Sequence, residues 1–132
     1  MPYGDNGGWP AIMLDLAQMG FPTEVPAGGP AVYNPIHEDD IVALVPKLLD
    51  AAAVPPTVVN LGGEEVVSVQ EWTAYLTELT GVEIPLVESP SAIPSVTVDL
   101  TKQHELVGKA ETSWREGMRR MLSVRHPELL SN

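Results

Sequence analysis

The sequence predicts an α/β fold, which would be classed as α+β if the chain is taken as an isolated piece. Segments with apolar residues at helical spacing alternate with short runs rich in β-branched residues. The 132 residues include 13 Pro and 11 Gly, a composition typical of short elements joined by many turns. This length fits one domain, so we expect a single domain over residues 1–132.

The first half of the chain is predicted to hold two helices. Ile12, Leu16 and Met19 recur at helical spacing. Three acids, Glu38–Asp40, crowd the start of the second helix, where they meet the positive end of its dipole. The expected elements are a loop over 1–8, a helix over 9–19, and extended segments over 23–26 and 31–36 with a turn between them. The second helix should begin at His37 or Glu38 and be kinked at Pro46. Its buried face is expected to consist of Ile41, Leu44, Leu48 and Leu49.

One segment is predicted to be a central strand. Residues 57–61 are rich in β-branched residues and lie between Pro55-Pro56 and Gly62-Gly63, which predicts a buried strand. Buried strands of this kind belong to parallel sheets. We therefore expect that the neighbouring strands belong to a sheet that this chain does not contain.

Two capping-box patterns begin the helices of the second half. Ser68 with Glu71 precedes a helix that ends at Gly81, and Ser113 with Glu116 precedes the last helix. The faces expected to be buried are Trp72, Tyr75, Leu76 and Leu79 in the first, and Trp114, Met118, Met121 and Leu122 in the second. The other expected elements are a strand over 83–87, a loop over 89–94, an extended segment over 96–98 and a helix over 100–107 capped by Asp99.

Charge and composition narrow the possible partners. The net charge is −11, and Lys47 is the only base before Lys102. Phosphate backbones and anionic lipids repel such a surface, so we expect no nucleic acid and no membrane as partner. The absence of Cys excludes disulfides and thiolate metal sites. Because no signal-peptide pattern and no long apolar run occurs either, the sequence favours a cytoplasmic protein.

Common catalytic motifs are absent from the sequence. No G-x-G-x-x-G, G-K-[ST] or G-x-S-x-G occurs, and no Tyr is followed by Lys at the fourth position. The glycine runs, Gly62-Gly63 included, have the wrong spacing for a pyrophosphate cradle. We therefore expect no catalytic residue in this chain and no cofactor or metal bound by the chain alone.

His37-Glu38-Asp39-Asp40 is the most prominent polar cluster. His37 and Asp40 share a helix face and could bind a metal or a polar substrate, but no third ligand is evident, and acids at a helix start explain the pattern better. The other residues of interest are His104, His126, Arg115, Arg119 and Arg120, which are expected on the solvated surface, and Trp9, Trp72 and Trp114, which are expected in the core.

The order of several short motifs resembles the extended short-chain dehydrogenase/reductase family, which comprises NAD(P)-dependent epimerases and dehydratases. Residues 33–41, Tyr-Asn-Pro-Ile-His-Glu-Asp-Asp-Ile, are similar to its segment of aromatic, aliphatic, His, any residue, Asp, Asp and aliphatic. The other landmarks are Pro2-Tyr3-Gly4 with Gly7-Gly8, Asn60-Leu61-Gly62-Gly63, Ser68 with Glu71, and Asp99 to Lys102 followed by Gly108, Trp114 and Glu116-Gly117.

This resemblance implies the C-terminal, substrate-binding portion of such an enzyme, without the N-terminal Rossmann domain that binds NAD or NADP and carries the catalytic Tyr and Lys. It implies substrate contacts at Tyr3, Asn34 and His37. Tyr33 departs from the family's pattern, because nucleotide-sugar enzymes commonly have there an Arg that binds the pyrophosphate. We therefore expect a smaller or less anionic ligand.

Two hypotheses about function follow. The first is a substrate-binding segment of an NAD(P)-dependent epimerase, dehydratase or related oxidoreductase, which is not catalytic alone and has a small-molecule substrate and a Rossmann-domain chain as partners. The alternative is a stand-alone module that binds a small ligand or dimerises through an exposed sheet edge. A third reading, a metal-dependent hydrolase, has only His37 in its favour.

Overall fold

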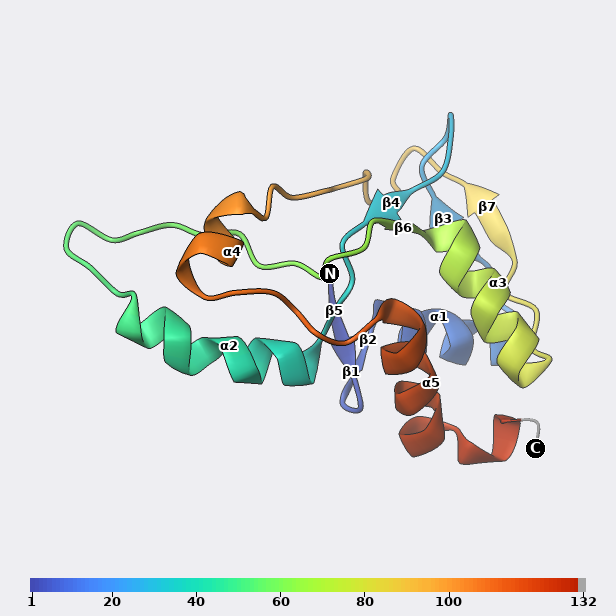
Figure 1. The fold of residues 1–132 in the computed structure, drawn as a ribbon. Helices are drawn as coiled ribbons and strands as arrows, with labels where there is room; N and C mark the ends of the chain where they lie inside the picture. Colours follow the sequence, from blue (N-terminus) through green and yellow to red (C-terminus); the bar gives the residue numbers. More distant parts are fainter. Residues whose placement is uncertain (131–132) are drawn as a thin grey trace.

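A computed structural model describes residues 1–130 and confirms the α/β class (Figure 1). The helices are α1 (Trp9–Gln18), α2 (Glu38–Asp50), α3 (Val69–Thr80), α4 (Thr101–Leu106) and α5 (Trp114–Arg125), followed by a 3-10 turn over Pro127–Leu129. The strands are β1 (Pro2–Gly4), β2 (Gly7–Gly8), β3 (Thr23–Val25), β4 (Val32–Tyr33), β5 (Ile36–His37), β6 (Val67–Ser68) and β7 (Leu86–Glu88). No helix in this described range is long and apolar enough to cross a membrane.

The strands are short and form three small sheets. β1 pairs in parallel with β5 and antiparallel with β2, while β3 pairs in parallel with β7 and β4 antiparallel with β6. The loop expected over residues 1–8 is therefore wrong, because β1 and β2 form a hairpin there. The chain reverses at Asp5-Asn6, and Gly7 and Gly8 follow in β2 with φ angles of 122° and 111°, a region open to glycine.

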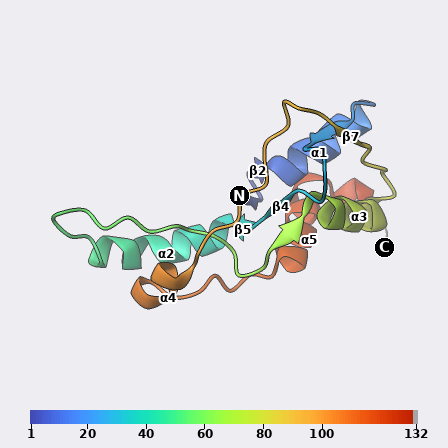
Figure 2. The same ribbon diagram turned by 90° about the horizontal axis from the view of Figure 1, so that it is seen from above.

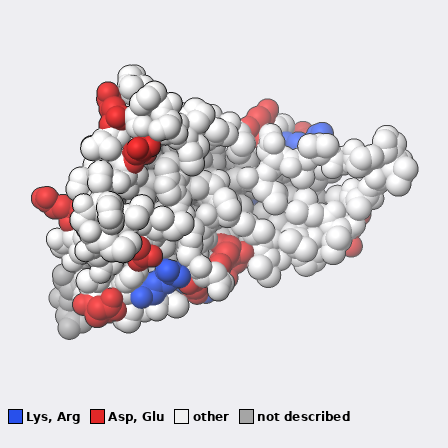
Figure 3. All heavy atoms as spheres, turned by 180° about the vertical axis from the view of Figure 1, so that it is seen from behind, with Lys and Arg blue, Asp and Glu red and all other residues white. Residues whose placement is uncertain are grey.

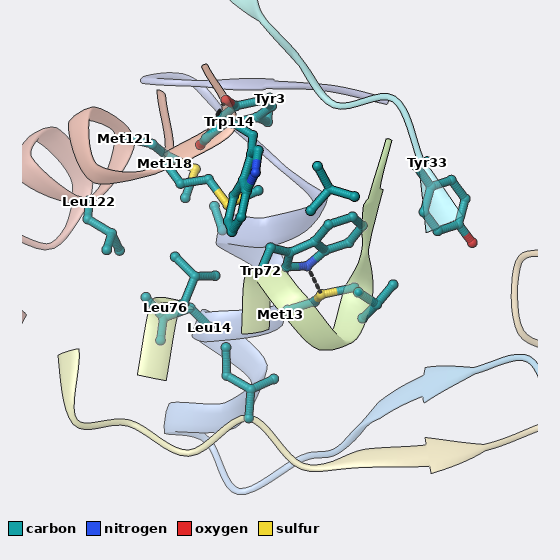
Figure 4. Packing of buried hydrophobic residues seen from close by; sticks show 14 of the residues in the cluster. Tyr3, Met13, Leu14, Tyr33, Trp72, Leu76, Trp114, Met118, Met121 and Leu122 are labelled. Carbon is teal, nitrogen blue, oxygen red and sulfur yellow. Dashed lines mark hydrogen bonds between the residues drawn. The ribbon is translucent and has the colours of Figure 1, made fainter. Parts of the chain in front are cut away.

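The main core lies between α1, α3 and α5, where Trp72, Met13 and Met118 are fully buried (Figure 4). The indole N–H of Trp72 donates to the sulfur of Met13 at 3.3 Å. The buried faces predicted for α3 and α5 are confirmed, although Tyr75 and Leu79 are only partly buried. These two helices therefore pack as their apolar spacing predicted.

Side chains begin three helices where the sequence predicted. The Ser68 hydroxyl accepts from the Glu71 N–H at 3.1 Å, and the Glu71 carboxylate accepts from the Ser68 N–H at 2.8 Å, which completes the capping box of α3. The Ser113 hydroxyl caps α5 by accepting from the Glu116 N–H at 3.3 Å, without the return bond, and His37 caps α2. Gly81 ends α3 with a φ of 71°. α2 continues through Pro46 to Asp50.

Two predicted helix faces are partly wrong. In α1, Ile12 and Met19 are 53% and 63% exposed, and the core instead takes a face that includes Met13 and Leu14. In α2, Leu49 is 71% exposed. Both helices carry apolar residues on more than one face, so the spacing alone could not select the side that packs.

The buried strand predicted over residues 57–61 is also wrong. The segment forms no strand, and Val58 is 77% exposed. Side chains of α4 bind this part of the chain instead. Lys102 donates to the Val58 carbonyl at 3.0 Å, and the Gln103 amide forms hydrogen bonds with the backbone N–H and C=O of Gly62, which follows the segment. No strand of residues 1–130 lies beside this segment to pair with it. Figures 1 and 2 show the segment with α2 and α4 in a lobe beside the α1–α3–α5 lobe.

Candidate functional site

Two of the three predicted substrate-contact residues meet where β1 and β5 pair. Tyr3 lies opposite His37 in register, with ring centroids 5.4 Å apart in an edge-to-face arrangement. Both side chains are buried, and the Tyr3 hydroxyl donates to the Trp114 carbonyl of α5 at 3.3 Å. Burial foremost, and then nearby acids, raise the pKa of Tyr3, so its phenol remains a neutral hydrogen-bond donor.

α5 approaches this pair closely because residue 117 is Gly. A Cβ there would overlap the Tyr3 hydroxyl and would lie 3.0 Å from Cδ2 of His37. The Trp-x-x-Gly motif noted in the sequence therefore has a packing role: Trp114 supplies the carbonyl and Gly117 the space.

His37 caps α2 and directs its other ring nitrogen at a carboxylate. Nδ1 accepts from the Asp39 N–H at 3.2 Å, so the neutral ring carries its proton on Nε2. Nε2 lies 3.9 Å from Oδ1 of Asp5, and neither atom has a hydrogen-bond partner among residues 1–130. In the same range, no group of three or more His, Cys, Asp or Glu side chains could hold a metal ion.

The acids of the predicted cluster bind other parts of the chain. Asp40 is buried and accepts from the backbone N–H groups of residues 111 and 112, both at 3.1 Å. Asp39 and Asp5 both bind Arg120, and these hydrogen bonds raise the pKa of its guanidinium. Arg120 is therefore held by two carboxylates and is not part of a simple solvated face.

Asn34, the third predicted contact residue, lies away from the Tyr3–His37 pair and forms hydrogen bonds with three other segments of the chain. Its amide nitrogen donates to the Gly63 carbonyl at 3.1 Å, and its amide oxygen accepts from the Val98 N–H at 3.0 Å. Its own backbone carbonyl accepts from the α-amino group of Met1 at 3.2 Å. Asn34 is 4% exposed, so its side chain serves mainly to position these segments.

A pocket with a volume of about 400 Å³ opens beside Asn34, which is a size suited to a small molecule. Its lining residues are Met1, Pro2, Trp9, Tyr33, Asn34, Leu61, Ile93, Val96 and Val98. Tyr33 packs edge-to-face on Trp9 at 5.3 Å, and its hydroxyl donates to the Ile93 carbonyl at 2.8 Å. Figure 4 shows Tyr33 set apart from the methionine and leucine side chains of the core.

The Gly62-Gly63 pair does not fit the phosphates of a dinucleotide. A Cβ on Gly63 would overlap the Pro35 carbonyl, so the pair makes space for its own chain. A phosphate cradle needs backbone N–H groups open to the ligand, whereas the Gly62 N–H donates to the side chain of Gln103 at 2.9 Å.

Sequence reasoning missed the pocket. One of its walls runs through residues 93–98, which were predicted as loop and extended chain, and a second wall is Trp9, which was predicted only as a core residue. The sequence did hold one indication of the pocket. Ile93, Val96 and Val98 are apolar, yet they lie in a segment with no helical spacing and no predicted strand partner. Only the fold brings them beside Tyr33, through the bridge between Tyr33 and Val96.

Comparisons with known proteins found matches among solved structures. MoeE5, in complex with UDP-glucuronic acid and NAD, is 23% identical over 98% of this chain and 46% of its own, with a TM-score of 0.76. UDP-glucose 4-epimerase from Thermotoga maritima, with UDP-glucose, is 22% identical over 97% of this chain and 44% of its own, with a TM-score of 0.72. UDP-glucuronic acid 4-epimerase from Bacillus cereus, in complex with UDP-glucuronic acid and NAD, is 16% identical over 94% of this chain and 42% of its own, with a TM-score of 0.75.

No protein-family profile and no curated protein sequence matches the chain. The chain spans less than half the length of these solved chains. At this level of identity the likeness shows the fold. The chain therefore has the fold of a portion of the NAD-dependent UDP-sugar epimerases, which is the likeness that the order of its motifs predicted.

Proposed function

We propose that the chain is the C-terminal, substrate-side portion of an NAD(P)-dependent epimerase, dehydratase or related oxidoreductase, and that it works with a separate nucleotide-binding portion of Rossmann type. One observation carries this proposal: 98% of the chain aligns with less than half of a protein solved with both NAD and a UDP-sugar acid. The lack of a Tyr-x-x-x-Lys pair and of a dinucleotide fingerprint supports the assignment of the chemistry to the other portion.

The surface of the α2 lobe supports such a partner. Val42, Val45 and Leu49 of α2 are between 43% and 71% exposed and follow one another at helical spacing, so they form an outer apolar stripe. The other side of α2 already packs in a second apolar cluster through Leu44. On the face drawn in Figure 3, the narrow end of the molecule is mainly uncharged. A helix that is apolar on two sides is normally covered on both, and the unpaired segment 57–61 offers backbone groups to a sheet edge.

We assign the substrate to the side of the chain that holds Asn34, Tyr3 and His37. Asn34 lines the pocket, but it is 4% exposed and its side chain is bonded at both ends of its amide, so we assign it the task of holding the pocket wall in place. Tyr3 and His37 are 2% and 1% exposed, so we assign them the task of holding β1 and β5 in position behind it.

Calorimetry tests the proposal. NAD⁺ is titrated into the chain alone and into the chain mixed with the nucleotide-binding portion, which is sought in the same reading frame before Met1 by its glycine fingerprint and its Tyr-x-x-x-Lys pair. We expect the mixture to form a complex that binds NAD⁺ and the chain alone to give no heat. Micromolar binding of NAD⁺ by the chain alone contradicts the proposal.

The stand-alone module remains the second candidate, because the pocket is formed by this chain alone and the outer stripe could pair two copies. Light scattering separates the two functions. A stable, compact monomer or dimer at high concentration favours the module. Aggregation that is rescued by the nucleotide-binding portion favours the enzyme segment.

A further inference from the structure

We propose that the pocket beside Asn34 receives an uncharged, mainly apolar part of the ligand and disfavours the diphosphate of a sugar nucleotide. The proposal rests on the proposed function and deepens it by naming the ligand chemistry. The fold neighbours were solved with UDP-glucuronic acid or UDP-glucose, so this inference separates the ligand of this chain from theirs.

The charge of the pocket is the first observation. None of its nine lining side chains is acidic or basic. The one charged group at the pocket is the α-ammonium of Met1, which is directed at the Asn34 carbonyl and whose pKa is lowered by burial. The net charge of the chain is −11, which adds to the repulsion of an anion.

The hydrogen bonds around the pocket are the second observation. Both ends of the Asn34 amide are bonded within the chain, and the Tyr33 hydroxyl is bonded to a carbonyl. The backbone N–H of Val96 donates to Val32 at 3.1 Å, and that of Val98 donates to Asn34. A diphosphate needs several donors to replace its water, and burying a charge without them is strongly unfavourable. The donors around this pocket are already bonded within the chain, so they are not available to a diphosphate.

The walls are the third observation. Besides Tyr33 and Asn34, the lining consists of apolar side chains and the Trp9 ring. Ile93 and Val96 are 57% and 53% exposed, so the rim presents apolar surface to water that a ligand could cover. Removal of such surface from water drives the binding of apolar groups without any charge.

Two probes and two variants test this inference on the chain itself. N-phenylnaphthylamine, a neutral fluorophore that brightens in apolar sites, is titrated into the chain, and UDP-glucose is titrated separately by calorimetry. Val96→Trp fills the pocket at an exposed lining position. Val124→Trp is the matched control, because Val124 of α5 is 56% exposed and does not line the pocket.

We expect the fluorophore to bind the original chain and the Val124→Trp variant alike, with at least about tenfold weaker binding to Val96→Trp. UDP-glucose should give no heat. The inference is overturned if UDP-glucose binds as tightly as the fluorophore, if Val96→Trp leaves the binding unchanged, or if the fluorophore does not bind at all. None of these measurements involves NAD⁺ or a second protein portion. A negative result here would therefore overturn this inference without deciding the proposed function, which is tested by NAD⁺ binding.

Discussion

Gly117→Ala tests the contact between α5 and the Tyr3–His37 pair. The added Cβ would overlap the Tyr3 hydroxyl and lie 3.0 Å from Cδ2 of His37. Neither ring can move freely, because Tyr3 is bonded to the Trp114 carbonyl and His37 caps α2. The substitution therefore forces α5 away from β1 and β5.

The expected cost combines two opposing effects. Overpacking of a buried site destabilises proteins by about 1–3 kcal/mol, while replacing Gly by Ala inside a helix stabilises it by about 1 kcal/mol. Because the overlap at Gly117 involves two anchored rings, we expect the packing cost to lie at the upper end. The free energy of unfolding should fall by about 1–2 kcal/mol.

Urea unfolding, followed by circular dichroism, measures this change. Tyr3→Phe removes the hydroxyl that Gly117→Ala would overlap, so the double variant should recover about 1 kcal/mol of the cost as a coupling energy. Ser123→Ala, at an exposed position of the same helix, is the control and should change stability little. A neutral or stabilising Gly117→Ala, or an unchanged cost in the Tyr3→Phe background, would refute the reasoning.

Three further predictions concern the helix ends and the outer stripe. Ser68→Ala removes the cap of α3 and should lower the free energy of unfolding by about 1 kcal/mol in urea titrations. The hydrogen bonds from Ser68 lower the pKa of Glu71 below its usual 4.5, so their stabilisation is present above pH 4.5 and is lost as the pH falls further. Glu71→Gln should therefore flatten the decline of the urea midpoint at acid pH, and an unchanged decline would contradict this. Leu49→Lys, at an exposed position, should change stability by less than about 0.5 kcal/mol, yet block co-purification with the nucleotide-binding portion, whereas Val124→Lys should not.

The sequence predicted the elements whose signals are local. The capping box at Ser68, the cap at Ser113 and the glycine stop at Gly81 need only neighbours along the chain, and all three were found where expected, although at Ser113 only the hydroxyl half of the predicted box is formed. The apolar spacing of α5 predicted its buried face because its other faces are polar. Such signals are sufficient where one helix face differs clearly from the rest.

The wrong predictions concern features that depend on contacts between residues far apart in the sequence. Leu49 has the spacing of a core residue but lies on the side of α2 that no described residue covers. The segment 57–61 has the composition of a buried strand, yet no strand of residues 1–130 pairs with it. Lys102 binds its Val58 carbonyl, and Gln103 binds Gly62 just after it. The pocket was missed for the same reason, since Val96 meets Tyr33 only through the fold.

Tyr3, Asn34 and His37 illustrate the limit for the site. The order of motifs identified residues that the fold does use, and two of them touch. It could not show that all three are buried, because burial depends on α5 and on the segment around Val98. Their role at a substrate stays a prediction.

Hydrogen–deuterium exchange of segment 57–61 tests the central claim most directly. Its backbone N–H groups are outside any strand in this chain, so they should exchange rapidly in the chain alone. If the chain is the substrate-side portion of a Rossmann-type enzyme, addition of the nucleotide-binding portion should protect these groups as the segment joins its sheet. Rapid exchange that persists in the mixture would contradict the account.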